Sequence, residues 1–221
     1  MTKERLSPEL MALRVARELR PGSFVNLGIG LPTLVSDYIR EETGVFLQSE
    51  NGFLGYGPRL SEGELDPDFI NASGHYVERL PGCAFFSSVD AFGMIRGGHL
   101  DATVLGAFQV AENGDLANWM VASRGMGSVG GAMDLASGAR QVIVVMEHTT
   151  RRGEPRLLHR CTYPLTAPGA AHLVVTDLGV VRVTAQGFCL EEIARGFSPA
   201  EVQALTEATL HLSPHLKEIE L

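Results

Sequence analysis

The sequence is short of several features that would assign a protein to a special class. It holds only three cysteines, Cys83, Cys161 and Cys189, and their odd number and wide spacing fit neither a disulfide framework nor a cysteine metal site. No apolar run approaches the length of a membrane span, and the charged N-terminus lacks the apolar core of a signal peptide. We therefore expect a cytoplasmic protein without membrane contact.

Positive charge is also scarce. Lys3 and Lys217 are the only lysines, they stand beside sixteen arginines, and the formal net charge is −8. Binding along nucleic-acid phosphates needs clustered lysine and arginine, and no basic stripe interleaved with aromatic residues occurs. The seven histidines show no metal-ligand spacing. These absences argue against a nucleic-acid partner and against a metal site.

What remains is the composition of an ordinary globular protein. The chain has 221 residues, 45% of them hydrophobic and 20% charged, and no low-complexity linker divides it. This length suffices for one well-filled core. We expect a single domain over residues 1–221.

The alternation of helical and strand patterns predicts an α/β fold. Residues 24–27 form an expected strand, a glycine turn and a helix over 32–42 follow, and a second apolar strand begins at Val45. The run 141–146 is apolar without alternation, which is typical of a parallel strand covered on both faces. We predict a mostly parallel, twisted sheet flanked by helices, with a first helix from Pro8 and a last helix over 199–210.

Glu50 lies where this fold type places its chemistry. It follows an expected strand and precedes Asn51-Gly52, a strong turn signal. In a right-handed crossover both strands end at the same edge, so Glu50 should lie near Gly28 and Gly30, whose N–H groups can bind an anion. The alternative is a solvated glutamate on a turn.

Two other functions fit parts of this pattern. Gly28-x-Gly30 with an acidic residue about 20 positions on resembles a dinucleotide-binding fingerprint, in which Glu50 would hold ribose hydroxyls, but Thr33 replaces the third glycine. Glycine-rich turns before helices, here and at 125–131, would also suit a phosphosugar-sensing module. Such a module has no use for a nucleophile.

Charged residues that follow the strand 141–146 allow further interpretations. His148 beside Glu147 fits either a base with its orienting acid or a structural hydrogen-bonding role, which is more common. An arginine run follows, and its usual meaning is a solvated loop, with phosphate contact as the alternative. The run consists of Arg151, Arg152, Arg156 and Arg160.

Several strings taken together resemble the β subunits of family I CoA-transferases of the 3-oxoacid type, which act on succinyl-CoA with acetoacetate or 3-oxoadipate. The string around Glu50, Gln48-Ser49-Glu50-Asn51-Gly52, is similar to the glutamate signature of that family. The chain departs from the family before Gly130, where Arg124 keeps the charge of a lysine. The other matching strings are 26–32, 118–119, 130–135, 146–149, 161–166 and 176–178.

The resemblance implies an enzyme in which Glu50 is the nucleophile and forms a glutamyl anhydride and then a glutamyl-CoA thioester. It implies an α-type partner subunit, in an αβ or α2β2 assembly, and acyl-CoA and carboxylic acid substrates. It also implies that no metal or redox cofactor is needed. The residues expected to bind substrate or CoA are Asn26, Gly28, Gly30, Asn51, Gly130 and Gly131.

Overall fold

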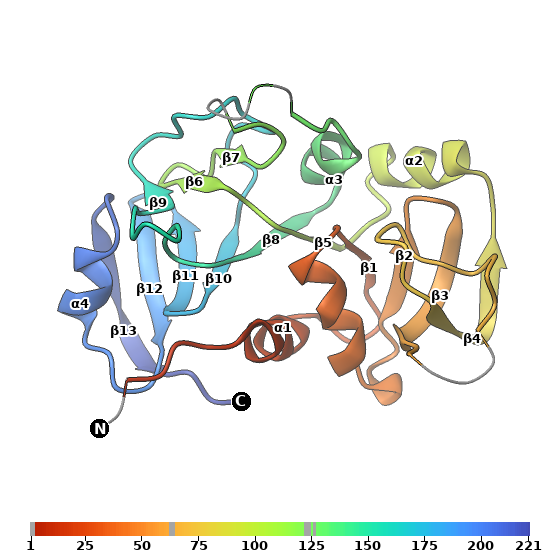
Figure 1. Ribbon diagram of the computed structural model, residues 1–221, viewed down its shortest axis with the longest axis horizontal. Helices are drawn as coiled ribbons and strands as arrows, with labels where there is room; N and C mark the ends of the chain where they lie inside the picture. Colours follow the sequence, from red (N-terminus) through yellow and green to blue (C-terminus); the bar gives the residue numbers. More distant parts are fainter. Residues whose placement is uncertain (1–2, 62–64, 122–124, 126) are drawn as a thin grey trace.

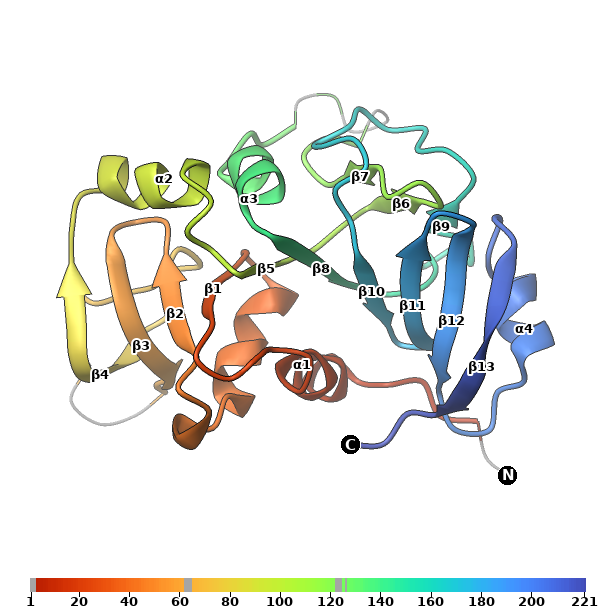
Figure 2. The same ribbon diagram turned by 180° about the vertical axis from the view of Figure 1, so that it is seen from behind.

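A computed structural model describes residues 3–61, 65–121, 125 and 127–221. Its main element is a ten-stranded sheet in the order β13-β12-β11-β10-β8-β5-β1-β2-β3-β4, beside a smaller sheet in the order β7-β6-β9 (Figures 1 and 2). Helices lie on both faces of the large sheet. The α/β prediction with a sheet flanked by helices is confirmed.

The centre of the large sheet is parallel. There, strand β1 (Phe24–Leu27) pairs in parallel with β2 (Phe46–Ser49) on one side and with β5 (Ala102–Leu105) on the other. Beyond β5 follow β8 (Gln141–Met146) and β10 (Leu173–Thr176), again in parallel. The strand that follows β1 in the sequence, β2, lies on one side of it, and the later strands β5, β8 and β10 lie on the other side. The strand order therefore reverses between β1 and β5, which makes this place a topological switch point.

Antiparallel strands extend both ends of this centre. β3 (Phe53–Arg59) and β4 (Val77–Phe85) follow β2 on one side, and β11 (Gly179–Thr184) and β12 (Gly187–Ile193) follow β10 on the other. The outermost strand, β13 (Leu210–Glu218), pairs in parallel with β12. The small sheet consists of β6 (Gln109–Ala111), β7 (Leu116–Ala117) and β9 (Leu157–Leu158).

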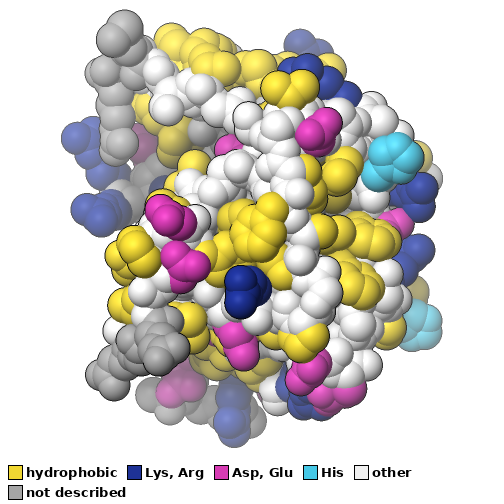
Figure 3. Space-filling model, turned by 90° about the vertical axis from the view of Figure 1, so that its right-hand side faces the viewer, with side chains coloured by type: hydrophobic (Ala, Val, Ile, Leu, Met, Phe, Trp, Pro, Cys, Tyr) yellow, Lys and Arg dark blue, Asp and Glu magenta, His cyan; other side chains and the backbone are white. Residues whose placement is uncertain are grey.

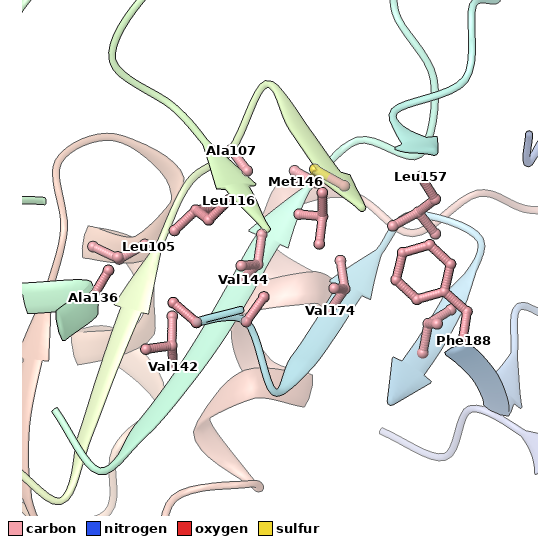
Figure 4. Packing of buried hydrophobic residues seen from close by; sticks show 14 of the residues in the cluster. Leu105, Ala107, Leu116, Ala136, Val142, Val144, Met146, Leu157, Val174 and Phe188 are labelled. Atoms are coloured by element: carbon pink, nitrogen blue, oxygen red, sulfur yellow. The ribbon is translucent and has the colours of Figure 1, made fainter. Parts of the chain in front are cut away.

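Strand β8 shows how the two cores are divided by the sheet. Val142 and Val144 belong to the core on the face of α2 (Ser88–Arg96) and α3 (Ala132–Gly138), part of which Figure 4 shows. Ile143 and Val145 belong to the core on the face of α1 (Pro8–Ala16). All four side chains are fully or almost fully buried. This confirms that the continuous apolar run is a strand covered on both faces.

The helix expected over 32–42 is a 3-10 helix in two pieces, η1 (Leu31–Tyr38) and η2 (Glu41–Thr43). The side chain of Ser36 donates a hydrogen bond to the carbonyl of Thr33 at 2.9 Å, and such local bonds compete with the regular helical pattern. Gly44 ends the second piece in a left-handed conformation, as expected for a C-terminal cap.

The last helix is shorter than predicted. α4 (Pro199–Ala204) begins with the capping box of Ser198 and Glu201, but it ends six residues before Leu210, which already belongs to β13. Gln203 explains the early end: its amide donates to the carbonyls of Thr206 and Ala208 and accepts from the Leu210 N–H. This side chain replaces the next helical turn and directs the chain into a strand.

One end of the large sheet is apolar on its surface. Figure 3 views the molecule from the side of β4 and α2, where hydrophobic side chains gather. Phe85 of β4 and Val89 of α2 are 62% and 79% exposed. Within the described residues, no helix has the length and apolar character that crossing a membrane requires.

Candidate active site

Glu50 is the second residue of a tight turn between β2 and β3. The N–H of Gly52 donates to the carbonyl of Ser49 at 3.1 Å, which closes the turn. Gly52 has a φ of +120°, and a Cβ atom there would lie 2.3 Å from the carbonyl oxygen of Phe86. The carbonyl oxygen of Gly52 accepts a hydrogen bond from the Phe86 N–H at 2.9 Å. Glycine is therefore required for the turn that carries Glu50.

The neighbours of Glu50 tie this turn to the loop 70–72. The Ser49 hydroxyl donates to the side-chain oxygen of Asn51 and accepts from the Ala72 N–H at 3.2 Å. The amide of Asn51 donates to the carbonyl of Ile70 at 2.8 Å. Asn51, a predicted binding residue, thus stabilises the turn and is not part of the cavity wall.

A cavity of about 710 Å³ lies at the carboxyl ends of the central strands, at the switch point between β1 and β5. The first residue after each of the five parallel strands contributes to its wall, so the sheet itself brings distant parts of the sequence together. These residues are Gly28, Glu50, Gly106, Glu147 and Asp177.

The other predicted glycines divide into two groups. Gly130 and Gly131 share the cavity wall with Glu50 and Gly28, whereas Gly30 is outside it and begins η1 with a φ of +88°. The N–H of Gly28 already donates to the carbonyl of Val104 at 2.8 Å. The N–H of Gly28 is therefore not free to bind an anion, contrary to the expectation from the sequence.

Asn26 lies in the core of the sheet. It is 1% exposed, and its amide donates to the side-chain oxygen of Gln48 at 2.6 Å and to the Gln48 carbonyl at 3.1 Å. Its own side-chain oxygen has no hydrogen-bond partner among the described residues. Asn26 is not part of the cavity wall, and its contacts join β1 to the strand that carries Glu50.

Gly131 is in direct contact with the carboxylate of Glu50. A Cβ atom at Gly131 would lie 2.1 Å from Oε2 of Glu50 and 3.1 Å from the ring of Phe92. Gly131 is the residue before α3, so this helix and the β2–β3 turn meet at the carboxylate. At Gly130 a Cβ atom would meet open space.

The environment of Glu50 raises the pKa of its carboxyl group. Burial is the main cause, and the negative charge of Asp134 adds to it. Asp134 is in turn paired with Arg96 of α2, with 2.7 Å between the guanidinium Nε and the carboxylate. A carboxylate that has lost part of its hydration is a stronger nucleophile, provided that it stays ionised.

His148 is a structural residue. It is fully buried, its ring nitrogens lie 2.9 Å and 2.8 Å from the hydroxyls of Thr176 and Thr206, and burial lowers its pKa to about 4. Its backbone N–H donates to the carboxylate of Asp177 at 2.6 Å. The hydrogen-bonding interpretation of His148 is therefore favoured over a catalytic base.

Two arginines lie in the cavity wall, and only Arg156 was named from the sequence, within a run interpreted as a solvated loop or a phosphate contact. Arg5 reaches the cavity from the N-terminal segment, and Arg156 comes from the arginine run after β8. No periodicity marks either residue, although the run itself was a signal for phosphate contact. Arg124 lies outside the described residues. Among the described residues, no cluster of three or more metal-ligating side chains is present.

Comparison with known proteins gives a consistent result. The family model named Coenzyme A transferase matches residues 9–204. The chain is 48% identical to one subunit of the 3-oxoadipate CoA-transferase of Acinetobacter baylyi, over 95% of this chain and 97% of that protein. It is 50% identical to the beta subunit of the acetate CoA-transferase of Escherichia coli K12, over 93% and 94%.

A solved structure shares the fold. The acyl-CoA transferase YdiF from Escherichia coli O157:H7 superimposes with a TM-score of 0.79 at 20% sequence identity, over 97% of this chain and 43% of that chain. The chain thus spans less than half the length of this structural neighbour, whereas it matches its sequence relatives over almost their full length.

Proposed function

Because this chain belongs to the coenzyme A transferase family, we propose that it is the glutamate-bearing subunit of a CoA-transferase of the 3-oxoacid type, with Glu50 as the nucleophile. One observation carries the proposal: the partly buried carboxylate of Glu50 lies in the wall of the 710 Å³ cavity at the switch point of the sheet. Ligand sites of open α/β sheets lie at this place.

The proposed reaction has two covalent intermediates. The Glu50 carboxylate attacks the carbonyl carbon of the acyl-CoA and expels CoA thiolate, which leaves an acyl-glutamyl anhydride. The thiolate then attacks the glutamyl carbonyl, releases the first carboxylic acid, and forms a glutamyl-CoA thioester. The second acid reverses both steps. Such covalent catalysis divides one exchange into easier steps and predicts ping-pong kinetics.

Gly130 and Gly131 are the best-placed donors for the oxyanions of these steps. Their N–H groups donate to no backbone oxygen within the described part of the chain, and Gly131 touches the Glu50 carboxylate. The loss of one oxyanion donor typically lowers the rate about 10²–10³-fold. Acyl-CoA and carboxylic acids are the substrates in this proposal, and the thioester supplies the activation without a metal or redox cofactor.

An α-type subunit completes the enzyme in this proposal, as an αβ or α2β2 assembly. The two sequence relatives described above support it, because both are named as one subunit of a CoA-transferase and not as the whole enzyme. The purified chain alone should show little or no transferase turnover, and addition of the partner should restore it. Robust turnover by the isolated chain would contradict the need for a partner.

The role of Glu50 can be tested by trapping. With acyl-CoA and no acceptor acid, the αβ complex should accumulate the thioester, which borohydride reduces to an alcohol and hydroxylamine converts to a hydroxamate. Peptide mapping should find either label on Glu50 alone, and Glu50→Ala should abolish both label and turnover. Glu50→Asp should lose most activity, because the carboxylate retracts by one methylene.

Other results of the trapping experiment would redirect the proposal. A label on Glu147, the acidic residue after β8, would move the nucleophile to that residue. No label that depends on acyl-CoA would favour the phosphosugar-sensing alternative. Nicotinamide binding in place of acyl-CoA binding would favour a dinucleotide-dependent oxidoreductase.

A further inference from the structure

Arg156 is an enclosed guanidinium without a close partner in the Glu50 cavity. Its side chain is only 21% exposed, and the nearest carboxylate oxygen, Oε2 of Glu147, lies 3.7 Å from its Nη2. This distance is too long for a hydrogen bond. Among the described residues, no side chain or backbone oxygen accepts a hydrogen bond from this guanidinium. The guanidinium keeps some contact with solvent, so an anion that enters the cavity can bind it without breaking a hydrogen bond within the described part of the chain.

The other arginine of the cavity wall is already bonded. Nη1 of Arg5 donates to the carboxylate of Asp177 at 2.6 Å. The second oxygen of this carboxylate accepts from the His148 N–H, which fixes the acceptor in place. An incoming anion would have to break this pair to reach Arg5. Arg156 offers its donors without such a loss.

The backbone holds Arg156 in a fixed position. Its N–H donates to the carbonyl of His148 at 3.1 Å, and its carbonyl accepts from the Val110 N–H at 3.0 Å. It directly precedes β9, which pairs with β6 in the small sheet. The backbone of Arg156 is therefore held by hydrogen bonds to two neighbouring segments of the chain.

Arg156 also lies where two cavities meet. A second cavity of about 890 Å³ shares Phe108, Glu147 and Arg156 with the Glu50 cavity. An elongated ligand with its reacting carbonyl at Glu50 would pass this guanidinium. The planar fork of an arginine matches the oxygens of a carboxylate or a phosphate, with two parallel hydrogen bonds.

We propose that Arg156 binds an oxyanion of the substrate and exchanges its loose contact with Glu147 for that group. This inference rests on the proposed function. The oxyanion is either a carboxylate at the far end of the acyl chain or a phosphate of CoA. Glu147 is 57% exposed, so its carboxylate can turn to solvent when the substrate arrives. The sequence relatives make the first source relevant, because 3-oxoadipate has a second carboxylate and acetate has none.

The test uses the αβ complex with two measurements, kcat/KM for succinyl-CoA and the Kd for free CoA. Arg156→Gln is compared with Arg160→Gln, which removes the same charge from an exposed position of the same segment that lines neither cavity. Loss of a hydrogen-bonded charge should lower kcat/KM about 10- to 100-fold in Arg156→Gln, through KM, and leave Arg160→Gln close to wild type. An unchanged Kd for CoA identifies the acyl carboxylate, and a weakened Kd identifies a CoA phosphate.

A second pair of variants separates binding from a structural role. Arg156→Lys keeps the charge and should recover part of the loss, and Glu147→Gln should lower KM for succinyl-CoA because it removes the competing anion. A structural role of the pair predicts no gain from Glu147→Gln. Unchanged kcat/KM and Kd in Arg156→Gln, or an unchanged or raised KM in Glu147→Gln, would overturn the inference. If the wild-type complex forms no label on Glu50, the proposed function itself fails.

Discussion

Gly131 and Glu50 are in contact so close that no side chain fits between them: a Cβ atom at Gly131 would lie 2.1 Å from Oε2 of Glu50 and 3.0 Å from its Cδ. The two residues come from different halves of the sequence. The contact places the carboxylate against the start of α3, and it makes the position of the proposed nucleophile sensitive to one methyl group.

Gly131→Ala should therefore impair catalysis more than stability. The added methyl group has to displace the carboxylate, and a shift of about 1 Å in a reacting group can cost about 10² in rate. We expect kcat to fall by that order, with a melting temperature close to that of the wild type. Gly93→Ala in α2 is the matched control, because a Cβ atom there meets nothing within 4 Å. Equal activity of both variants would contradict the contact.

Gly52→Ala should instead destabilise the protein. The new Cβ would lie 2.3 Å from the Phe86 carbonyl oxygen at a φ of +120°, so steric overlap and backbone strain add up to about 3 kcal/mol or more. Gly74→Ala, at a φ of +77° but in open space, should cost only about 1 kcal/mol. Chemical denaturation measures both. Similar losses in the two variants would show that overlap with Phe86 is unimportant.

The raised pKa of Glu50 predicts the acid side of the activity profile. Catalysis needs the ionised carboxylate, so activity should fall with decreasing pH at a higher pH than for an ordinary glutamate with a pKa of 4.5. Asp134→Asn removes a like charge, which should lower this pKa and move the acid limb of kcat/KM to lower pH. Asp101→Asn, at the opposite ends of the strands beside Arg140, is the control and should leave the limb in place.

His148 predicts a loss of stability in mild acid. Its folded-state pKa of about 4 lies below the ordinary value of 6.5, so between these values the unfolded chain binds a proton that the folded chain does not. This contribution to stability is complete above pH 6.5 and is lost as the pH falls toward 4, by roughly 3 kcal/mol. Denaturation at several pH values should show a flatter dependence for His148→Gln than for the wild type. Parallel curves would contradict a neutral buried imidazole.

The sequence predicted the centre of the sheet better than its ends. Strand β8 was recognisable because its run of apolar residues matches burial on both faces. Strand β3 was not predicted, and of β4 only the end was, as a short apolar strand over 84–86, because Gly55, Gly57, Pro58 and Pro81 interrupt the patterns. Proline is tolerated on an edge strand, as Pro81 is on β4, and at an irregularity of the ladder, as Pro58 is at the register shift between Tyr56 and Arg59. Local pattern does not reveal such positions.

The part of the candidate site that lies within one βαβ crossover unit, from β1 to β2, could be predicted from the sequence. Glu50 and Gly28 end neighbouring strands of the same unit, so their shared edge follows from topology. The contact with Gly131 and the position of Arg156 depend on how α3 and β9 pack against that edge, which no spacing encodes. Asn26 was predicted as a binding residue, and its contacts with Gln48 show a residue that joins two strands.

The cavity lies at the switch point between β1 and β5, and this position matters for protein engineering. The space between β1 and β5 is a property of strand order, so it should persist when Glu50 is removed. If the proposed function holds, affinity and turnover are then separable: a variant that lacks Glu50 would still accommodate acyl-CoA and could serve as a sensor for it. Glu50 would be the one side chain to replace, on a turn that Gly52 maintains at the rim of a pre-formed cavity.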